Sequence, residues 1–183
     1  DELKNIAEGL IETFNYAGNE SIRLFKEGLK IEIKEDQSPV SNGDLRVNDL
    51  ISKKIAELTP NIPIISEETS DNKSLNNLKD FWLIDPIDGT YDYINNLQEF
   101  TINAGLIINK KPVAGLICAP AKKRMFYSYG KNLAFELIDG KPVKLGQTDD
   151  FNKNEIKFVS YSNKIKPEIE RIHKKLNVKK FVK

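Results

Sequence analysis

The chain has 183 residues, of which 39% are hydrophobic and 30% are charged, a balance typical of a folded globular protein. Lysine and arginine together number 28 and aspartate and glutamate 27, so the net charge is close to zero. This balance argues against a protein that binds nucleic-acid polymers through a broad basic surface. No apolar run approaches the roughly 20 residues of a membrane-spanning helix, so we expect no membrane span.

The first half of the chain predicts two helices and several short strands. Apolar side chains at a helical spacing predict the helices, and short apolar runs predict the strands. Gly28 is the expected end of the first helix. In chain order we expect a helix over 3–28, a strand over 29–34, a loop over 35–44, a helix over about 42–58, a strand over 62–65, a polar loop over 69–80 and a strand over 81–84.

The second half reads mainly as an antiparallel meander. Strands over 100–108 and 113–120 are joined by the turn Asn-Lys-Lys-Pro, which predicts a hairpin. Further strands are expected over 124–129, 133–138 and 156–160, then a lysine-rich helix over 166–176 and a strand from 178. We therefore expect an α/β (α+β) fold with a largely antiparallel sheet and two N-terminal helices. Residues 1–150 would form one domain and 151–183 the start of a second α/β domain.

The single cysteine, Cys118, lies in the apolar run VAGLICAP, where a buried strand residue is expected. One cysteine cannot form an internal disulfide, so nothing indicates an oxidising compartment, and we expect a cytoplasmic protein. The only histidine, His173, lies in the lysine-rich C-terminal stretch, which argues against a catalytic cysteine–histidine pair.

Two of the predicted strands end in acidic residues. Glu67 and Glu68 follow the first of them, and Asp85 and Asp88 follow the second. Ligand sites in α/β folds gather at the carboxyl ends of strands, so these side chains would converge if the two strands are neighbours. Packed carboxylates repel one another, and a hard divalent cation such as magnesium relieves that repulsion.

The spacing after Asp85 is also informative. Pro86 fixes the backbone and has no N–H, so we expect the chain to turn immediately after the strand. Asp85 and Asp88 could then lie on either side of a metal pair. Gly89 permits close backbone approach, and Thr90 would begin a helical turn whose free N–H groups bind a phosphate oxygen. Simple turn chemistry remains the alternative for either acidic segment taken separately.

Three segments resemble the inositol monophosphatase superfamily: WLIDPIDGT over 82–90, SEE over 66–68 and IKEDQSPVSNGD over 33–44. They occur in the family's order. EFTINAGLI over 99–107 and the QSPVS loop resemble its 3'(2'),5'-bisphosphate nucleotidase branch. The resemblance implies the N-terminal part of a layered αβαβα sandwich that hydrolyses phosphate monoesters with two or three magnesium ions. The implied substrate is 3'-phosphoadenosine 5'-phosphate, and inositol or another sugar monophosphate is the alternative.

The resemblance also implies roles for individual residues. The catalytic residues would be Asp36, Thr90 and Glu67, with Asp36 and Thr90 orienting and deprotonating the attacking water. The metal ligands would be Glu67, Asp85, the Ile87 carbonyl and Asp88, and the N–H groups of Gly89 and Thr90 would hold the phosphate. Glu68 and Asp44 would support the ligands, although Asp44 could equally cap the second helix.

The sequence departs from the family pattern in several places. A later Trp-Asp-x-Ala-Ala motif, whose aspartate completes the second metal site, is expected in the family, and Trp82 is the only tryptophan here. Tyr91-Asp92-Tyr93 stands where the nucleotidases usually have Lys-Glu-Phe, and Ser41 replaces a threonine. A catalytically incomplete remnant that binds metal or phosphate is therefore a further alternative. A homodimer or a separate C-terminal half could complete such a chain, because half a sandwich exposes apolar surface.

Overall fold

The computed structural model describes residues 2–69, 78–146, 156–159 and 165–182. The chain forms two compact units, Asp1–Leu145 and Gly146–Lys183, which are described separately. The predicted domain boundary at 150 lies outside the described residues. So do most of the predicted loop over 69–80, the last residue of the strand predicted over 156–160, and residue 183.

The first unit begins with the two predicted helices, α1 (Glu2–Glu27) and α2 (Asn42–Leu58). Gly28 ends α1 as predicted, in a left-handed conformation with φ of +96°, and its N–H donates to the Phe25 carbonyl. Between the helices, β1 (Ile31–Ile33) pairs with β2 (Pro39–Ser41) in an antiparallel hairpin. The prediction of a continuous loop over 35–44 was therefore wrong, because pairing with β1 overrides the turn-forming composition of this segment.

The described residues of the first unit that follow α2 form a seven-stranded sheet in the order β3-β4-β5-β6-β7-β8-β9. Among the described strands of this sheet, only the β3–β4 pair is parallel, which confirms the predicted largely antiparallel sheet. β9 was not predicted. The strands are β3 (Ile64–Ser66), β4 (Phe81–Asp88), β5 (Thr101–Ile108), β6 (Lys111–Ala119), β7 (Arg124–Tyr129), β8 (Ala134–Ile138) and β9 (Lys141–Lys144). Two short helices, α3 (Thr90–Ile94) and the 3-10 turn η2 (Pro120–Lys122), connect strands.

Strand β4 continues through Pro86, so the expected turn directly after Asp85 was wrong. Asp85 pairs with Asn103 and Asp88 pairs with Thr101, and the register shifts between the two pairs. A proline lacks the N–H that a regular ladder needs, and such an irregularity accommodates it. The chain turns instead at Gly89, whose φ is +92°, directly before α3.

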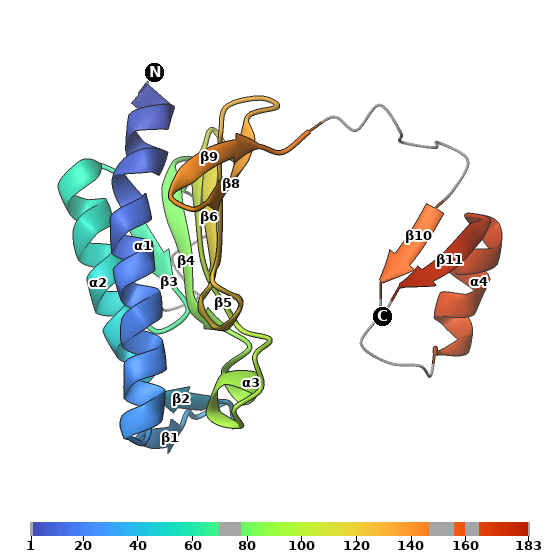
Figure 1. Ribbon diagram of the computed structural model, residues 1–183, viewed down its shortest axis with the longest axis horizontal. Helices are drawn as coiled ribbons and strands as arrows, with labels where there is room; N and C mark the ends of the chain where they lie inside the picture. The colour runs from blue at the N-terminus through green and yellow to red at the C-terminus, as the bar shows by residue number, and fades with distance from the viewer. Residues whose placement is uncertain (1, 70–77, 147–155, 160–164, 183) are drawn as a thin grey trace. The chain divides into compact units, whose positions relative to one another are not determined.

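Helices α1 and α2 lie side by side over one face of the sheet (Figure 1). Alternate residues of the strands face these helices, and Trp82, Ile84 and Leu106 are almost completely buried. On the opposite face, Leu83 and Ile117 remain 51% and 48% exposed. The first unit is therefore a two-layer structure with its core between the helices and the sheet.

Cys118 is buried in β6, as predicted, and burial raises the pKa of its thiol to about 11. Such a thiol stays protonated and behaves as a small core residue at neutral pH.

The second unit is a small β-α-β arrangement. β10 (Ile156–Val159) and β11 (Val178–Val182) form a parallel pair, and α4 (Pro167–Lys175) lies between them in the sequence. These elements were predicted from the sequence. No helix in the described ranges is long and apolar enough to cross a membrane.

Candidate metal and phosphate site

The structure places the two acidic strand ends next to each other. Strands β3 and β4 are parallel neighbours, and Ser66 is the partner of Ile84 in their register. Glu67 therefore leaves β3 beside β4, and its N–H donates to the Ile84 carbonyl at 3.2 Å. The side chains of Glu67 and Asp85 therefore lie close together where β3 ends, as the sequence predicted for neighbouring strands.

Asp85 is the most strongly perturbed carboxyl group of this site. Burial, and then the negative charges of Glu67 and Asp88, raise its pKa from 3.8 to about 7. Its Oδ1 atom is buried and has no hydrogen-bond partner among the described residues. A buried acceptor without a donor is costly, so this carboxylate is suited to receive a ligand.

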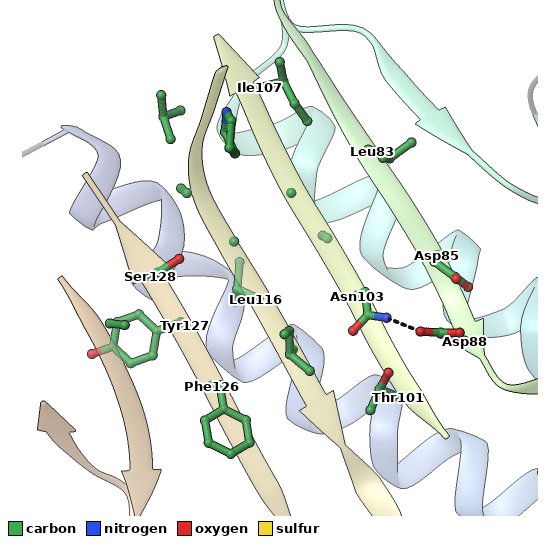
Figure 2. Close-up of a pocket in the computed structure, with 18 of the residues that line it drawn as sticks. Leu83, Asp85, Asp88, Thr101, Asn103, Ile107, Leu116, Phe126, Tyr127 and Ser128 are labelled. Atoms are coloured by element: carbon green, nitrogen blue, oxygen red, sulfur yellow. Dashed lines mark hydrogen bonds between the residues drawn. The ribbon is translucent and has the colours of Figure 1, made fainter. Parts of the chain in front are cut away.

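Asn103 belongs to the same site, and the sequence analysis did not single it out. It is the strand partner of Asp85 on β5, and its Nδ2 donates to Asp88 Oδ2 at 3.2 Å (Figure 2). Its own Oδ1 is buried without a partner among the described residues. The one available signal was an amide inside the mostly apolar run TINAGLII.

Thr90 contacts Asp44, a residue that the sequence left open between helix cap and metal support. Thr90 Oγ1 lies 3.1 Å from Asp44 Oδ1 and 3.1 Å from the Ile87 carbonyl. Asp44 is fully buried, and its Oδ2 accepts from the N–H of Ser41 at 2.8 Å and from its hydroxyl at 2.5 Å. Asp44 thus completes the capping box of α2 and also reaches the site.

Gly89 holds the turn that brings Thr90 to this position. A Cβ atom at residue 89 would lie 3.0 Å from the Glu99 carbonyl oxygen, and the φ of +92° disfavours any other residue. Glycine is therefore required here on two separate grounds.

The hydrogen bonds that the structure gives the Asp36 side chain are local. Asp36 Oδ1 accepts from the hydroxyl of Ser38 at 2.5 Å and from its N–H at 2.9 Å, and these bonds lower the Asp36 pKa. Asp36 lies on the turn between β1 and β2. Its proposed role toward the attacking water stays a prediction.

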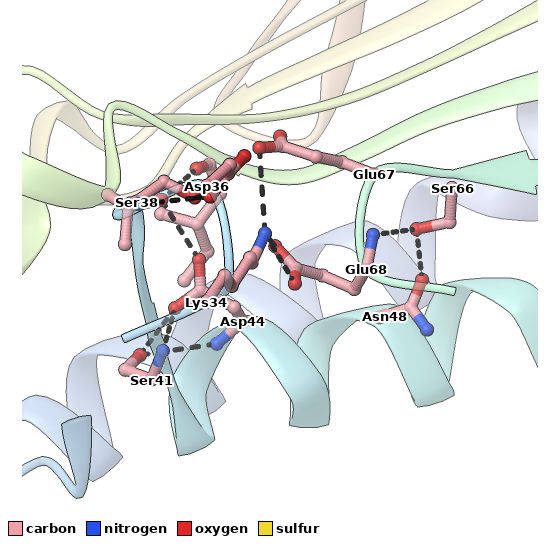
Figure 3. A network of polar contacts seen from close by, with 11 residues as sticks. Lys34, Asp36, Ser38, Ser41, Asp44, Asn48, Ser66, Glu67 and Glu68 are labelled. Atoms are coloured by element: carbon pink, nitrogen blue, oxygen red, sulfur yellow. Dashed lines mark hydrogen bonds and ion pairs between the residues drawn. The ribbon is translucent and has the colours of Figure 1, made fainter. Parts of the chain in front are cut away.

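Lys34 connects the β1–β2 turn with the acidic pair that follows β3. Its Nζ lies 2.9 Å from Glu68 Oε1, 2.8 Å from Glu68 Oε2 and 3.8 Å from Glu67 Oε1 (Figure 3). The side chain of Glu68 is only 4% exposed, whereas that of Glu67 is 52% exposed. Burial raises the Glu68 pKa, and the bond to Lys34 opposes that effect.

Among the described residues, no three acidic, histidine or cysteine side chains are close enough together in this structure to hold a metal ion. The residues of this site nevertheless suit a hard divalent cation. The available donors are carboxylate and carbonyl oxygens, which magnesium prefers, and Asp85 combines an unpartnered buried oxygen with repulsion from its neighbours. A cation among Glu67, Asp85 and Asp88 would remove that repulsion.

Beside these carboxylates, an open hollow of about 1170 Å³ lies on the sheet face that α1 and α2 do not cover. Its wall is mostly apolar, and its polar residues include Asp85, Asp88, Thr101 and Asn103 (Figure 2). Charged and apolar surfaces thus meet at one end of the hollow.

The sequence profile of the inositol monophosphatase family matches residues 2–182. The chain belongs to the inositol monophosphatase family. Among its relatives is the 3'(2'),5'-bisphosphate nucleotidase CysQ of Aggregatibacter actinomycetemcomitans, 32% identical over 147 residues that cover 79% of this chain and 55% of the relative. CysQ of Salmonella typhimurium is 40% identical over 96 residues, covering 52% of this chain and 39% of the relative. The chain thus spans about half the length of the curated relatives that it matches.

Solved structures of this family show the same fold. CysQ from Bacteroides thetaiotaomicron aligns with a TM-score of 0.68 and 23% identity, over 98% of this chain and 72% of that one. An IMPase/NADP phosphatase complexed with Mg²⁺ and phosphate aligns with a TM-score of 0.74 and 16% identity, over 100% of this chain and 67% of that one. At these identities the likeness establishes the inositol monophosphatase fold and leaves the substrate to be tested.

Proposed function

We propose that this protein hydrolyses phosphate monoesters with magnesium and that its substrate is a 3'(2'),5'-bisphosphate nucleotide, such as 3'-phosphoadenosine 5'-phosphate. The observation that supports the proposal most is the half-buried carboxylate of Asp85, which lies beside Glu67 and Asp88 and has a buried Oδ1 atom without a hydrogen-bond partner among the described residues. The similarity to CysQ nucleotidases supports the choice of substrate.

In this proposal, Glu67, Asp85, Asp88 and the Ile87 carbonyl hold the magnesium, with two or three ions in a complete site. Bound magnesium supplies a Lewis acid that polarises the phosphoryl group and makes a bound water more acidic. The phosphate lies against the N–H groups of Gly89 and Thr90 at the start of α3, where helical N–H groups lack intrahelical acceptors. The open hollow beside the carboxylates is available to the organic part of the substrate.

The Thr90 hydroxyl orients the attacking water in this scheme. Thr90 Oγ1 can accept a hydrogen bond from the water while donating its own proton toward Asp44, which lies 3.1 Å away. As the water oxygen bonds to phosphorus and the ester P–O bond breaks, the water proton moves to Thr90 and the Thr90 proton moves to Asp44. The leaving alkoxide takes its proton from solvent.

Inositol or another sugar monophosphate is the second candidate substrate. Tyr91-Asp92-Tyr93 favours it, because this segment departs from the Lys-Glu-Phe expected of the nucleotidase branch. The two substrates differ in the group that carries the phosphate, and a direct comparison separates them.

The test is phosphate release by the purified chain from 3'-phosphoadenosine 5'-phosphate and from inositol 1-phosphate, with and without magnesium. We expect magnesium-dependent release, faster from the nucleotide, that Asp85→Asn abolishes. Asp49→Asn is the matched control, because Asp49 pairs with Lys53 on the surface of α2. Equal turnover by Asp85→Asn and the wild type would contradict the metal assignment. Absence of release from a folded chain would favour the catalytically incomplete alternative.

A further inference from the structure

Lys34 contributes its backbone and its side chain to two different parts of the site. Its N–H donates to the Ser38 carbonyl at 2.8 Å, and its carbonyl accepts from the N–H of Gln37 at 3.0 Å. These two bonds close the base of the turn that contains Asp36. The turn includes Gln37 in the left-handed region, with a φ of 68°, so its conformation depends on such closure.

The side chain of Lys34 leaves this turn and reaches the segment that follows β3. Its ammonium group lies within hydrogen-bonding distance of both oxygens of the buried Glu68 carboxylate (Figure 3). Glu68 is the neighbour of Glu67 in the chain, and the Glu68 N–H donates to Ser66 Oγ at 3.3 Å. Among the ion pairs of the described residues, Lys34 is the only cationic partner of Glu67 and Glu68.

We infer that Lys34 is a positioning residue. It holds the turn that contains Asp36 against the Glu67–Glu68 segment and so fixes the position of these two parts of the site relative to each other. Lys34 closes the β1–β2 turn through its backbone, and its side chain binds Glu68, which is 34 residues away in the sequence. A single lysine therefore joins two segments that are distant in the sequence. The effect of Lys34 on metal affinity rests on the proposed function. Its effect on how well the turn that contains Asp36 is ordered does not depend on that function.

Replacing Lys34 by itself would mix two effects. It would leave the carboxylate of Glu68 buried without its partner, which destabilises the fold, and it would add net negative charge beside the metal ligands, which attracts cations. The double substitution Lys34→Gln with Glu68→Gln avoids both problems. It removes one positive and one negative charge, so the net charge of the site is unchanged, and no buried charge is left unpaired.

The experiment compares three properties of the full chain: thermal unfolding, Mn²⁺ binding followed by electron paramagnetic resonance, and hydrogen exchange of residues 30–41 without metal. We expect the double variant to melt close to the wild type. Its Mn²⁺ affinity should fall about tenfold, the lower range of effects seen when support of a metal ligand is lost. Residues 30–41 should exchange faster, and Lys34→Arg should retain the wild-type affinity because it keeps the charge and the donors.

The matched control is the double substitution Lys122→Gln with Glu99→Gln. This pair also joins segments that are distant in the sequence, at 2.7 Å, but it lies on the surface. We expect it to leave both Mn²⁺ affinity and exchange over 30–41 unchanged.

Two results would overturn the inference. One is unchanged exchange over 30–41 in the Lys34/Glu68 variant, whatever its metal affinity. The other is an unchanged Mn²⁺ affinity in that variant when the wild type binds Mn²⁺ and Asp85→Asn does not. If the wild type and Asp85→Asn bind Mn²⁺ equally, the proposed function fails instead, and exchange in the metal-free protein still decides the role of Lys34.

Discussion

At Asp85, burial and neighbouring carboxylates both favour the protonated form. Its folded pKa of about 7 lies above the ordinary value of 3.8, so between these values the folded state binds more protons than the unfolded state. The stability of the metal-free protein should therefore fall as pH rises from about 4 to about 7 and then level off. Denaturant unfolding in EDTA at pH 5 and pH 8 measures this loss. Asp85→Asn should reduce the difference, and an equal difference in both proteins would contradict the assignment.

Asn103 should matter for metal binding through its bond to Asp88. Asn103→Ala removes the donor that orients the Asp88 carboxylate, so we expect Mn²⁺ affinity to fall about tenfold. Isothermal titration calorimetry measures the affinity. Asn61→Ala, at an exposed position, is the matched control and should change nothing. Wild-type affinity in Asn103→Ala would show that Asp88 needs no support from β5.

The site residues differ in how far the sequence could predict them. Glu67 and Asp85 each follow a short apolar run in the sequence, and placing the strands of those runs side by side was enough to bring them together. The Thr90–Asp44 contact spans 46 residues, and a residue that also caps a helix gives no local sign of its second contact. Asn103 faces Asp85 only through the β4–β5 register, which a single sequence does not specify.

At the level of elements, Gly43 in the first turn of α2 allows α3 to pack closely. An added Cβ would clash with the Tyr93 hydroxyl and lie 2.7 Å from Tyr93 Cε1, while that hydroxyl donates to the Ser21 carbonyl of α1 at 2.6 Å. Gly43→Ala should therefore destabilise the protein by about 1–3 kcal/mol. Urea unfolding measures the change. Gly9→Ala is the control, because its Cβ would meet only the flexible end of Leu58, at 3.3 Å.

The elements that the sequence predicted correctly have strong periodic signals of their own. Helices α1 and α2 and the β5–β6 hairpin are of this kind. The hairpin partner β2 and the edge strand β9 were missed, because each is three or four residues long and contains a proline. Their pairing depends on a neighbouring strand rather than on their own composition. The same dependence on pairing explains why β4 continues through Pro86.

At the scale of the whole molecule, the described residues of the first unit give one helical layer, the seven-stranded sheet and the small β1–β2 hairpin. Leu83 and Ile117 are half exposed on the sheet face opposite the helices. The αβαβα sandwich expected from the sequence contains further layers, and the chain spans about half the length of its curated relatives. Self-association and a separate C-terminal half both remain predictions.

The two units should differ greatly in stability. The hydrophobic core of the described residues extends from Ala7 to Tyr127 and lies entirely within the first unit. In the second unit, Ile172 and Leu176 on or beside α4 are 49% and 53% exposed, and fewer than about 40 residues rarely build an adequate core.

A chain ending at Leu145 should therefore unfold at nearly the same urea concentration as the full chain. The buried Trp82, hydrogen-bonded to Thr59, reports this transition by fluorescence. A much lower midpoint for the shortened chain would show that residues 146–183 stabilise the sheet, and α4 should then exchange its amide protons as slowly as β5.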